Sequence, residues 1–348
     1  MAGGVKAQAL WFTGPRRVEI RQADVPAPGA GEVLVKTIVS AVSAGTELLI
    51  YRGQAPTDLV ADETLPALTG TLAFPLRYGY AAVGRVVGLG SGVSETLAGT
   101  TVFAFQPHAT HFTARVGSLL PIPDATPAES AAFLPHIETA VNLLLDGAPR
   151  VGEQVAVLGQ GTVGLLVTTL LARLPLASLV AVDGFALRRQ ASLSLGAHAC
   201  LDSANGDLTH ELHLLLQGHR PYPGADLTYE LTGNPSTIDL AIGVAGIGGR
   251  IVIGSWYGTK RAAPDLGGRF HRGRLRLISS QVSSLAPELG AAWTTSRRLS
   301  FALSLLPTLP LAGLISHRIP FQEAAQAYRM LDEDPSQTLQ VLLTYEAD

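Results

Sequence analysis

The chain has 348 residues, of which 47% are hydrophobic and 15% charged, and its formal net charge is −3. This length allows two domains of ordinary size with filled cores, and the charge balance argues against nucleic acid or an anionic membrane as a partner. The single cysteine, Cys200, excludes an intrachain disulfide and a cysteine-rich zinc lobe. No apolar run reaches the roughly 18 residues of a membrane span. We therefore expect a soluble, cytoplasmic protein.

The first part of the chain is β-rich. Residues 5–127 consist of short β-branched runs separated by Gly and Pro, which is typical of a barrel with many tight turns. From residue 124 to 147, apolar residues recur at helical spacing behind Pro127, which suits a first helical turn. We place the boundary between two domains at 127/128.

From Gln154 the pattern alternates between strands, glycine turns and helices. Further strands are expected at 225–233 and 249–258, each after a helix, as a doubly wound parallel sheet requires. Two more helices are expected at 293–306 and 320–334, followed by a strand at 337–345. The fold class is therefore α/β, with a β-barrel domain of residues 1–127 and 281–348 and a Rossmann domain of residues 128–280.

A G-x-G-x-x-G motif at Gly159, Gly161 and Gly164 lies between the apolar strand 155–158 and a helical stretch. In this context the glycines allow a tight turn, a close approach of the backbone to a pyrophosphate and close helix packing. The helix start near Thr162 offers N–H groups to the phosphates. An ordinary strand-to-helix turn is the alternative. The candidate dinucleotide contacts are Gly159, Gln160, Gly161, Thr162, Val163 and Gly164.

Asp183 ends the next apolar strand, where a carboxylate can accept hydrogen bonds from a ribose 2′-OH. Because a carboxylate repels the 2′-phosphate of NADP, the sequence favours NAD as cofactor. Arg188 and Arg189 offer cations to that phosphate, so NADP stays open. A solvated loop residue is the alternative interpretation of Asp183. Further candidate cofactor contacts at the ends of the later strands are Thr232, Gly254 and Ser255.

Several motifs together resemble the medium-chain alcohol dehydrogenase and quinone reductase superfamily over essentially the whole chain. The matching motifs are SAGTE at 43–47, YGYAAVG at 78–84, ETA at 138–140 and the glycine turn. This resemblance implies a GroES-like barrel as catalytic domain, a contact of Thr139 with the nicotinamide, and a homodimer or homotetramer. The segments SAGTELLIYRG, FPLRYGYAAVGRVV and SSQVSSLAPELGAAWTTSRR resemble a zinc-lacking branch of bacteriochlorophyllide dehydrogenase-like members.

The resemblance also identifies positions at which zinc-dependent members hold their catalytic metal. Those members carry a Cys where this chain has Ala44 and a His-Glu pair where it has Tyr80 and Ala81, and their third ligand falls near Pro135. None of these replacements is a plausible zinc ligand. We therefore predict that the chain has no catalytic zinc.

Without a metal, another group must stabilise or protonate the substrate oxygen. The resemblance implies that Thr46 relays a proton, and Tyr80 could donate a hydrogen bond or act as general acid from the position of a lost ligand. His136, beside the third position, completes the catalytic candidates. Each has a structural alternative: Thr46 braces a turn, Tyr80 is a half-buried strand aromatic, and His136 is a core histidine.

Other titratable groups near these motifs have two interpretations each. Glu47 and Glu138 either belong to the site or form ion pairs with Arg52 or another cation. His108 and His111 have the spacing of two metal ligands, but no further ligand is nearby, and we expect a solvated loop.

The basic segment 269–281 is either a solvated face or contacts an anionic part of the substrate or the cofactor phosphates. Trp256, Tyr257 and Trp293 either line a wide pocket for a bulky or planar small-molecule substrate or serve as core and subunit contacts. We expect a zinc-independent NAD(P)-dependent oxidoreductase that acts on a secondary alcohol or ketone. The alternatives are a quinone or enone (C=C) reductase and a non-catalytic dinucleotide-binding protein.

Overall fold

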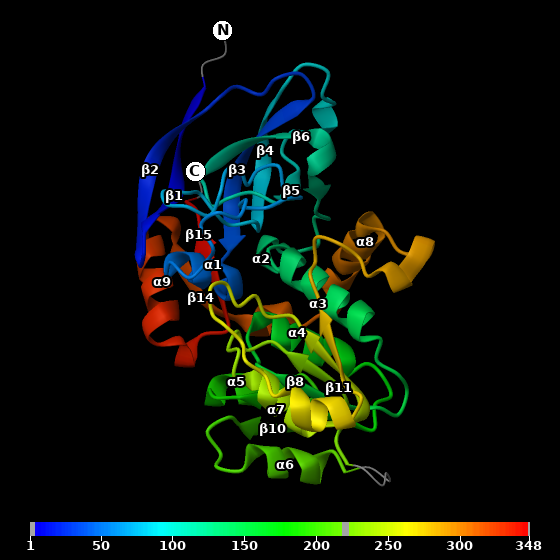
Figure 1. Cartoon of the computed structure of the whole chain (residues 1–348). Coiled ribbons are helices and arrows are strands. Elements are labelled where there is room, and N and C mark those ends of the chain that lie inside the picture. Colours follow the sequence, from blue (N-terminus) through cyan, green and yellow to red (C-terminus); the bar gives the residue numbers. More distant parts are fainter. Residues whose placement is uncertain (1–3, 218–222, 347–348) are drawn as a thin grey trace. The chain divides into compact units, whose positions relative to one another are not determined.

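The computed structural model describes residues 4–217 and 223–346, which form two compact units. The first unit comprises the described residues up to Pro135 and from Leu303 onward, and the second is His136–Ala302. In Figure 1 the first unit is coloured blue to cyan and orange to red, and the second mainly green to orange. None of the helices in the described part is both long and apolar enough to cross a membrane.

The first unit is built on a seven-stranded mixed sheet of order β14-β15-β3-β4-β5-β7, with β6 beside β3 and a separate β1-β2 hairpin. The predicted β-rich texture is confirmed, and the expected final strand is β15, antiparallel to β3. Its strands are β1 (Val5–Gly14), β2 (Arg17–Val25), β3 (Glu32–Ala41), β4 (Ala82–Leu89), β5 (Thr101–Ala104), β6 (His111–Arg115), β7 (Leu120–Pro121), β14 (Ile315–Pro320) and β15 (Gln340–Thr344).

Alternate residues of these strands make the core of the first unit. Val33 and Val35 of β3 pack with Ala82 and Val86 of β4 and with Phe112 of β6, as the two-residue period of a strand requires. The helices of this unit are α1 (Ala44–Tyr51), α2 (Ala128–Ala131) and α9 (Ala324–Glu333). The short helix α1 interrupts the region expected to be all β, and the helix expected at 320–334 is confirmed as α9.

The helix expected over 124–147 is divided in two. After α2 the chain turns and starts again as α3 (Leu134–Gly147). Pro135 lies in the first turn of α3, where its missing N–H breaks no helical hydrogen bond. The boundaries of the two units fall within α3 and α8 (Thr295–Leu305), later in the chain than 127/128 and 280/281, where the sequence places them.

The second unit contains a six-stranded sheet of order β10-β9-β8-β11-β12-β13 with parallel pairing throughout. In chain order this is 3-2-1-4-5-6, so the predicted doubly wound Rossmann sheet is confirmed. Its strands are β8 (Gln154–Leu158), β9 (Ser178–Asp183), β10 (Ala199–Asp202), β11 (Ala225–Glu230), β12 (Ala245–Ile253) and β13 (Arg276–Ser279), and its crossover helices are α4 (Thr162–Leu171), α5 (Ala186–Ser194), α6 (Leu208–Leu215) and α7 (Thr237–Val244).

Helices cover the central strands of this sheet. Strand β8 is buried along its whole length, as expected where both faces are covered. Ala156 and Leu158 face a cluster that includes Leu212 of α6 and Ile242 of α7. The strand order reverses between β8 and β11, and ligands of such sheets bind beyond the carboxyl ends of the strands at this point.

Candidate functional site

The corner between β8 and α4 has no room for side chains at two of its glycines. Gly159 has φ +94°, and a Cβ there would lie 2.7 Å from the carbonyl carbon of Leu231. A Cβ on Gly164 would lie 2.0 Å from Gly159 O. At Gly161, the N-cap of α4, a Cβ would meet nothing within 4 Å. The corner therefore combines tight backbone packing with open space in front of a helix N-terminus.

That open space fits the pyrophosphate of a dinucleotide. The first-turn N–H groups of a helix have no partner within the helix, and the dipole of α4 favours an anion there. Thr162 and Val163, the first residues of α4, are both half-buried. The three glycines of the motif thus have distinct roles. Gly159 turns the chain, Gly161 leaves space for a ligand at the helix N-terminus, and Gly164 lets helix α4 approach strand β8.

Gln160 supports this corner from inside the protein. Its side chain is fully buried, with Nε2 donating to Gly159 O at 3.2 Å and Oε1 accepting from Thr168 Oγ1 at 3.0 Å. Its backbone N–H donates to Asp183 Oδ2 at 2.8 Å. The side chain and the backbone N–H of Gln160 thus both make hydrogen bonds within the protein, whereas the sequence predicts that Gln160 contacts the cofactor.

Asp183 ends β9 and is 8% exposed, so it is not the solvated loop residue of the alternative interpretation. Its Oδ1 accepts from Phe185 N at 2.8 Å, while Oδ2 accepts from Gln160 N. Each carboxylate oxygen can accept a second hydrogen bond. Asp183 can therefore hold the corner and still accept hydrogen bonds from ribose hydroxyls.

The two arginines after Asp183 have different partners. Arg189 donates to Asp183 O at 3.0 Å and pairs with Asp202 at 2.8 Å. The Arg188 guanidinium lies 4.8 Å from the centre of the Phe185 ring, and burial lowers the pKa of Arg188. Arg189 is thus part of the structure of β9 and β10.

Glu230, at the end of β11, is a fully buried carboxylate that the sequence analysis did not single out. Its Oε1 accepts from Thr232 N and Oγ1, at 2.8 and 2.5 Å, and from Thr237 Oγ1 at 2.8 Å. Its Oε2 accepts from Tyr257 Oη at 2.5 Å. One signal could have found it, because an acid ends an otherwise apolar strand here as Asp183 does in β9.

The remaining predicted cofactor residues meet beside Glu230. A Cβ on Gly254 would lie 2.6 Å from side-chain carbons of Leu143 and Leu231, so those leucines pack closely against the chain after β12. Ser255 Oγ accepts from Gly233 N at 2.9 Å. The structure thus brings Thr232, Gly254 and Ser255 together at the carboxyl ends of β11 and β12.

Helix α3 carries the predicted residues His136 and Thr139. His136 is 4% exposed, whereas Thr139 is half-buried among buried neighbours. Glu138 accepts from Arg298 Nη2 at 3.0 Å, and Asn142 Oδ1 accepts from Arg298 Nη1 at 2.6 Å. Burial raises the pKa of Glu138, although Arg298 opposes this shift. Glu138 thus forms the ion pair of the structural alternative, with Arg298 as its cation.

A hydroxyl cluster forms at the start of α1 in the first unit. Ser43 is the N-cap, but Glu47 Oε1 accepts from the Ser43 N–H at 2.8 Å and the Ser43 hydroxyl makes no capping bond. That hydroxyl instead accepts from Tyr80 Oη at 2.5 Å, and Thr46 Oγ1 accepts from the same Tyr80 hydroxyl at 3.3 Å. The structure thus brings together the predicted Thr46 and Tyr80, and it adds Ser43.

Behind this cluster lies a chain of buried polar groups. Glu47 and His108 are both fully buried, and His108 Nε2 lies 3.1 Å from Glu47 Oε2, which also accepts from Tyr328 Oη. His108 Nδ1 lies 2.7 Å from Ser40 Oγ, which contacts Tyr345 Oη at 2.9 Å. Burial raises the pKa of Glu47, but His108 and the donated hydrogen bonds outweigh it, so this pKa lies below its usual value.

The expectation of a solvated loop is therefore wrong for His108. Gly79 has φ +111°, and a Cβ there would lie 2.6 Å from the His108 ring, so this glycine admits the imidazole. His111 is half-buried in β6. Arg52 pairs with Asp332 at 2.5 Å rather than with Glu47. Across residues 4–217 and 223–346, no three His, Cys, Asp or Glu side chains gather as metal ligands do.

The cationic part of the basic segment 269–281, which is residues 269–276, lies away from the glycine corner. Arg276 begins β13, in register with Arg250 of β12, whereas the corner follows the carboxyl end of parallel β8. Arg269 donates to Ala245 O at 2.6 Å. The cations of the segment therefore lie at the amino ends of the strands, which favours the solvated face over a contact with the cofactor phosphates.

Comparison with known proteins gives relatives along the whole chain, although no family model matches it. The chain is 26% identical over 367 residues to 2-desacetyl-2-hydroxyethyl bacteriochlorophyllide A dehydrogenase of Cereibacter sphaeroides, covering 99% of each protein. It is 27% identical over 268 residues to L-threonine 3-dehydrogenase of Stenotrophomonas maltophilia, covering 67% of this chain and 72% of the relative.

Solved structures share the fold. An alcohol dehydrogenase of Escherichia coli CFT073 complexed with NADH has a TM-score of 0.78 at 19% identity, covering 98% of this chain and 100% of that chain. A protein of Sinorhizobium meliloti 1021 described as a zinc-binding dehydrogenase, bound to NADP, has a TM-score of 0.76 at 19% identity, covering 98% of this chain and 99% of that chain. These neighbours confirm the expected α/β fold class.

Replacing His108 should destabilise the first unit. We expect His108→Leu to lower the free energy of unfolding by about 3 kcal/mol, because it leaves the Glu47 carboxylate buried without its imidazole. Urea denaturation at neutral pH measures this loss. His111→Leu, in the same segment, is the control and should cost less than about 1 kcal/mol. Equal effects of the two changes would contradict the importance of the buried pair.

This contribution depends on pH in a defined direction. Because the pKa of Glu47 is depressed, the stabilisation is present above the usual carboxyl value of about 4.3 and is lost as the pH falls through the depressed pKa.

Proposed function

We propose that this chain, an alcohol dehydrogenase-type oxidoreductase related in sequence and fold to the medium-chain dehydrogenases/reductases, is a zinc-independent dehydrogenase. It moves a hydride between a nicotinamide dinucleotide, NAD in preference to NADP, and a secondary alcohol or its ketone. The observation that carries the proposal is the Tyr80 hydroxyl, held by Ser43 and Thr46 at a position where zinc-dependent members have a metal ligand.

The cofactor proposal rests on the second unit. The space at Gly161 and the first turn of α4 receive the pyrophosphate, and Asp183 accepts hydrogen bonds from the adenosine ribose. The bound nicotinamide supplies or accepts the hydride. Neighbours of the same fold bind NADH and NADP, which supports a nicotinamide cofactor, and the Asp183 carboxylate supports NAD.

In this proposal the hydroxyl cluster of Tyr80, Ser43 and Thr46 supplies the proton that the substrate oxygen receives. In the direction of ketone reduction, Tyr80 Oη donates its proton to the oxygen that gains negative charge. As the proton leaves, the hydroxyls of Ser43 and Thr46 rotate and donate to the phenolate oxygen, from 2.5 and 3.3 Å. The Ser43 hydroxyl is available to Tyr80 because the N–H groups of Thr46 and Glu47 donate to the backbone oxygen of Ser43, at 3.0 and 2.8 Å, and not to its side chain.

The protonation state of Tyr80 suits a donor. Burial raises the pKa of Tyr80 to about 12, against the opposing hydrogen bonds with Ser43 and Thr46. The phenol is therefore protonated at neutral pH and available as an acid.

Independence from zinc is supported by the residues at the ligand positions. Ala44, Ala81 and Pro135 have no side-chain atom that binds zinc. Tyr80 has such an oxygen, but its hydroxyl is engaged by Ser43 and Thr46.

The substrate proposal draws on the relatives. Their names specify a hydroxyethyl group on bacteriochlorophyllide and the 3-hydroxyl of threonine, and both are secondary alcohols. The first of these substrates is also planar and bulky. We therefore propose small molecules with a secondary alcohol group as the substrate class. We further propose that the enzyme is a cytoplasmic homodimer or homotetramer.

Replacing Gly161 should separate binding from folding. Gly161→Ala fits the backbone, with φ −68° and no atom within 4 Å of the new Cβ, but its methyl group fills the space at the N-terminus of α4. We expect NADH affinity to fall about tenfold or more with an unchanged melting temperature. Fluorescence titration and thermal unfolding measure the two quantities. Gly117→Ala, also in open space, should change neither. Unchanged NADH affinity in Gly161→Ala would place the pyrophosphate elsewhere.

Replacing Asp183 should reduce the difference between the affinities for NADH and NADPH. We expect Asp183→Ser to weaken NADH binding by about tenfold and to leave NADPH binding less affected, because the ribose acceptor and the repulsion of a 2′-phosphate are both lost. Titration with each dinucleotide measures this. Asp202→Ser is the control, since Asp202 is the register partner of Asp183 on β10 and pairs with Arg189. Identical affinities of wild type and Asp183→Ser for both cofactors would exclude the ribose contact.

Replacing Tyr80 should affect turnover and spare cofactor binding. We expect Tyr80→Phe to lower kcat for ketone reduction by about 100-fold, the usual contribution of a general acid, with NADH affinity within about twofold of wild type. The neighbouring Tyr78, whose ring meets that of Tyr80 edge-on at 6.0 Å, provides the control variant Tyr78→Phe. A Tyr80→Phe enzyme with the wild-type rate would remove Tyr80 from the mechanism.

Removing metal should not affect the reaction. We expect protein treated with a chelator to reduce ketones with NADH at the rate of untreated protein, and elemental analysis to find no stoichiometric zinc. A rate that falls on chelation and returns with zinc would contradict the proposal. Cofactor binding without turnover over a panel of secondary alcohols, ketones and enones would instead favour a non-catalytic binding protein, and reduction of the C=C bond alone would favour an enone reductase.

A further inference from the structure

Arg298 of α8 is a buried cation that the proposed reaction does not use. It is 2% exposed, and all five of its N–H groups have acceptors. These acceptors are the side chains of Glu138 and Asn142 on α3 and the backbone carbonyls of Val282 and Ser284. Arg298 lies 3.0 and 3.1 Å from Glu138 Oε1, 2.6 Å from Asn142 Oδ1 and 3.2 Å from Ser284 O. The guanidinium thus fastens the chain at Val282 and Ser284 to α3.

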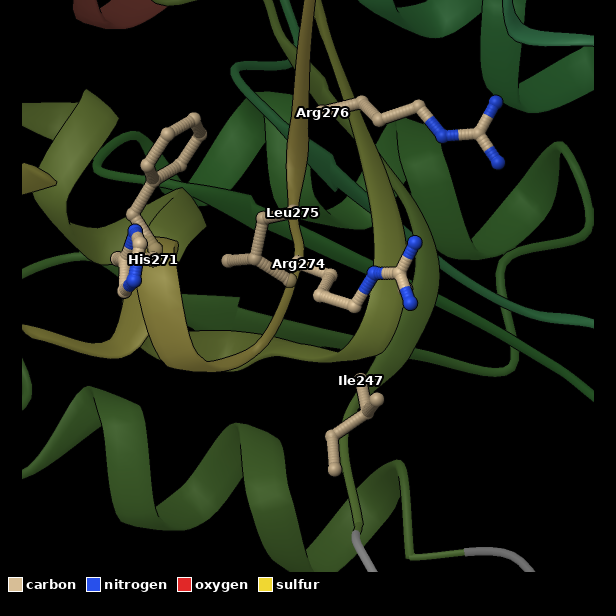
Figure 2. Close-up of a pocket in the computed structure, with 7 residues that line it drawn as sticks. Ile247, His271, Arg274, Leu275 and Arg276 are labelled. Atoms are coloured by element: carbon tan, nitrogen blue, oxygen red, sulfur yellow. The ribbon is translucent and has the colours of Figure 1, made fainter.

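Segment 280–284, which contains both carbonyls, lies at the carboxyl edge of the Rossmann sheet. It follows the last residue of β13, whereas Figure 2 shows the opposite end of this strand, where Arg276 lies. The first N–H of the segment, that of Ser280, donates to Ile253 O at 3.0 Å, next to the predicted cofactor residue Gly254. The segment therefore borders the same edge of the sheet as the glycine corner.

The position of this segment depends on polar bonds to α3. Every residue from Gln281 to Arg297 is described, and none of them is buried within the chain. Apolar packing therefore contributes little to holding this stretch. In addition to the two carbonyls bound by Arg298, the Ser280 hydroxyl donates to Asp146 Oδ2 at 2.5 Å and accepts from Asn142 Nδ2 at 3.1 Å.

Helix α3 presents two neighbouring rows of residues to this edge of the sheet. Residues four apart on a helix lie on one face. One row binds Arg298 and segment 280–284 and consists of Glu138, Asn142 and Asp146. The other row contains Thr139 and Leu143, and Leu143 packs closely against Gly254. Arg298 therefore holds the segment beside the helix that carries Thr139, the residue for which the resemblance implies a contact with the nicotinamide.

The nicotinamide half of the cofactor belongs on this side of the sheet. In a sheet of this strand order, the two nucleotides lie on either side of the point where the order reverses, between β8 and β11. The proposed function assigns the adenosine ribose to Asp183, at the end of β9. The nicotinamide nucleotide then lies on the side of β11, β12 and β13.

We propose that Arg298 is a positioning residue for hydride transfer. It holds segment 280–284 at the place where this segment borders the nicotinamide half of the cofactor. This role rests on the proposed function, because it requires a dinucleotide at the carboxyl edge of the sheet. It is a role of the fork of Arg298 and not of its charge alone.

A charge-conserving variant separates these two properties. Arg has five donors in a rigid planar fork, whereas Lys has three donors around a single ammonium nitrogen. Arg298→Lys keeps a positive charge beside Glu138, but its ammonium group cannot bond to Glu138, Asn142 and both carbonyls together. The variant should therefore retain the buried ion pair and release the segment.

The test compares NADH with ADP-ribose, which lacks the nicotinamide ring, on the full-length protein. We expect Arg298→Lys to bind NADH about tenfold more weakly and ADP-ribose within about twofold of wild type, because only the nicotinamide half meets the released segment. Isothermal titration calorimetry measures both affinities. The kcat for ketone reduction should also fall about tenfold or more, since small misplacements of a reacting group are costly.

Two further variants control for folding. Arg250→Lys alters another buried arginine of the same sheet, which pairs with Glu153 at 2.6 Å at the amino ends of the strands. It should lower the melting temperature without changing the ratio of the NADH and ADP-ribose affinities. Asn142 is 1% exposed and cannot touch a ligand, so Asn142→Ala should weaken NADH selectively by loosening the same segment, and it decides the question if Arg298→Lys does not fold.

The outcomes separate this role from the proposed function. Equal losses of affinity for NADH and ADP-ribose in the Arg298 and Asn142 variants, or no loss in either, would overturn the positioning role and leave the proposed function standing. Wild-type protein that binds neither ligand would overturn both.

Discussion

A hydrogen bond from a backbone N–H to a buried carboxylate recurs at the turns on which the candidate site depends. In each case the N–H belongs to a residue that starts or follows the turn, and the distance is 2.8 Å. The pairs are Gln160 with Asp183, Ser43 with Glu47, and Thr232 with Glu230. Because an ionised acceptor in a water-poor environment makes a stronger bond than a neutral one, each pair fixes a short backbone segment with a single side chain.

Such carboxylates need further hydrogen-bond donors when they are buried. Glu47 has His108 and Tyr328, and Glu230 has Tyr257 together with the threonines of the following turn. The groups that support Glu47 come from distant parts of the first unit, so the geometry of its turn depends on the correct assembly of that unit, whereas Glu230 is supported by residues close to it in the chain. The precision of the site follows from this dependence, since no turn can shift without leaving a buried charge short of a partner.

The spacing of residues along the chain predicted the strands, helices and glycine corner of the second unit. It did not predict which groups pair with the buried charges. The corner 159–164 and its flanking strand and helix are contiguous, so periodicity and the order of glycines sufficed. His108 and Glu47 are 61 residues apart, and Arg298 and Glu138 are 160 apart. Strand pairing brings the first pair together and a glycine at position 79 admits the ring, and neither is visible in local sequence. For the same reason local sequence did not decide between a solvated face and a ligand contact for the basic segment 269–281.

The arrangement around Tyr80 also bears on how a hydroxyl could replace a metal in the proposed reaction. An alcohol is about as weak an acid as bulk water. A phenol with a pKa of about 12 is the stronger acid, so its proton passes downhill to an alkoxide formed by hydride transfer. In the oxidative direction the same step is uphill and becomes easier as the pH rises towards the pKa of Tyr80. Burial of Tyr80 thus keeps the phenol protonated at neutral pH, as the proposed ketone reduction requires, and moves formation of the phenolate that would accept the alcohol proton to more alkaline solution.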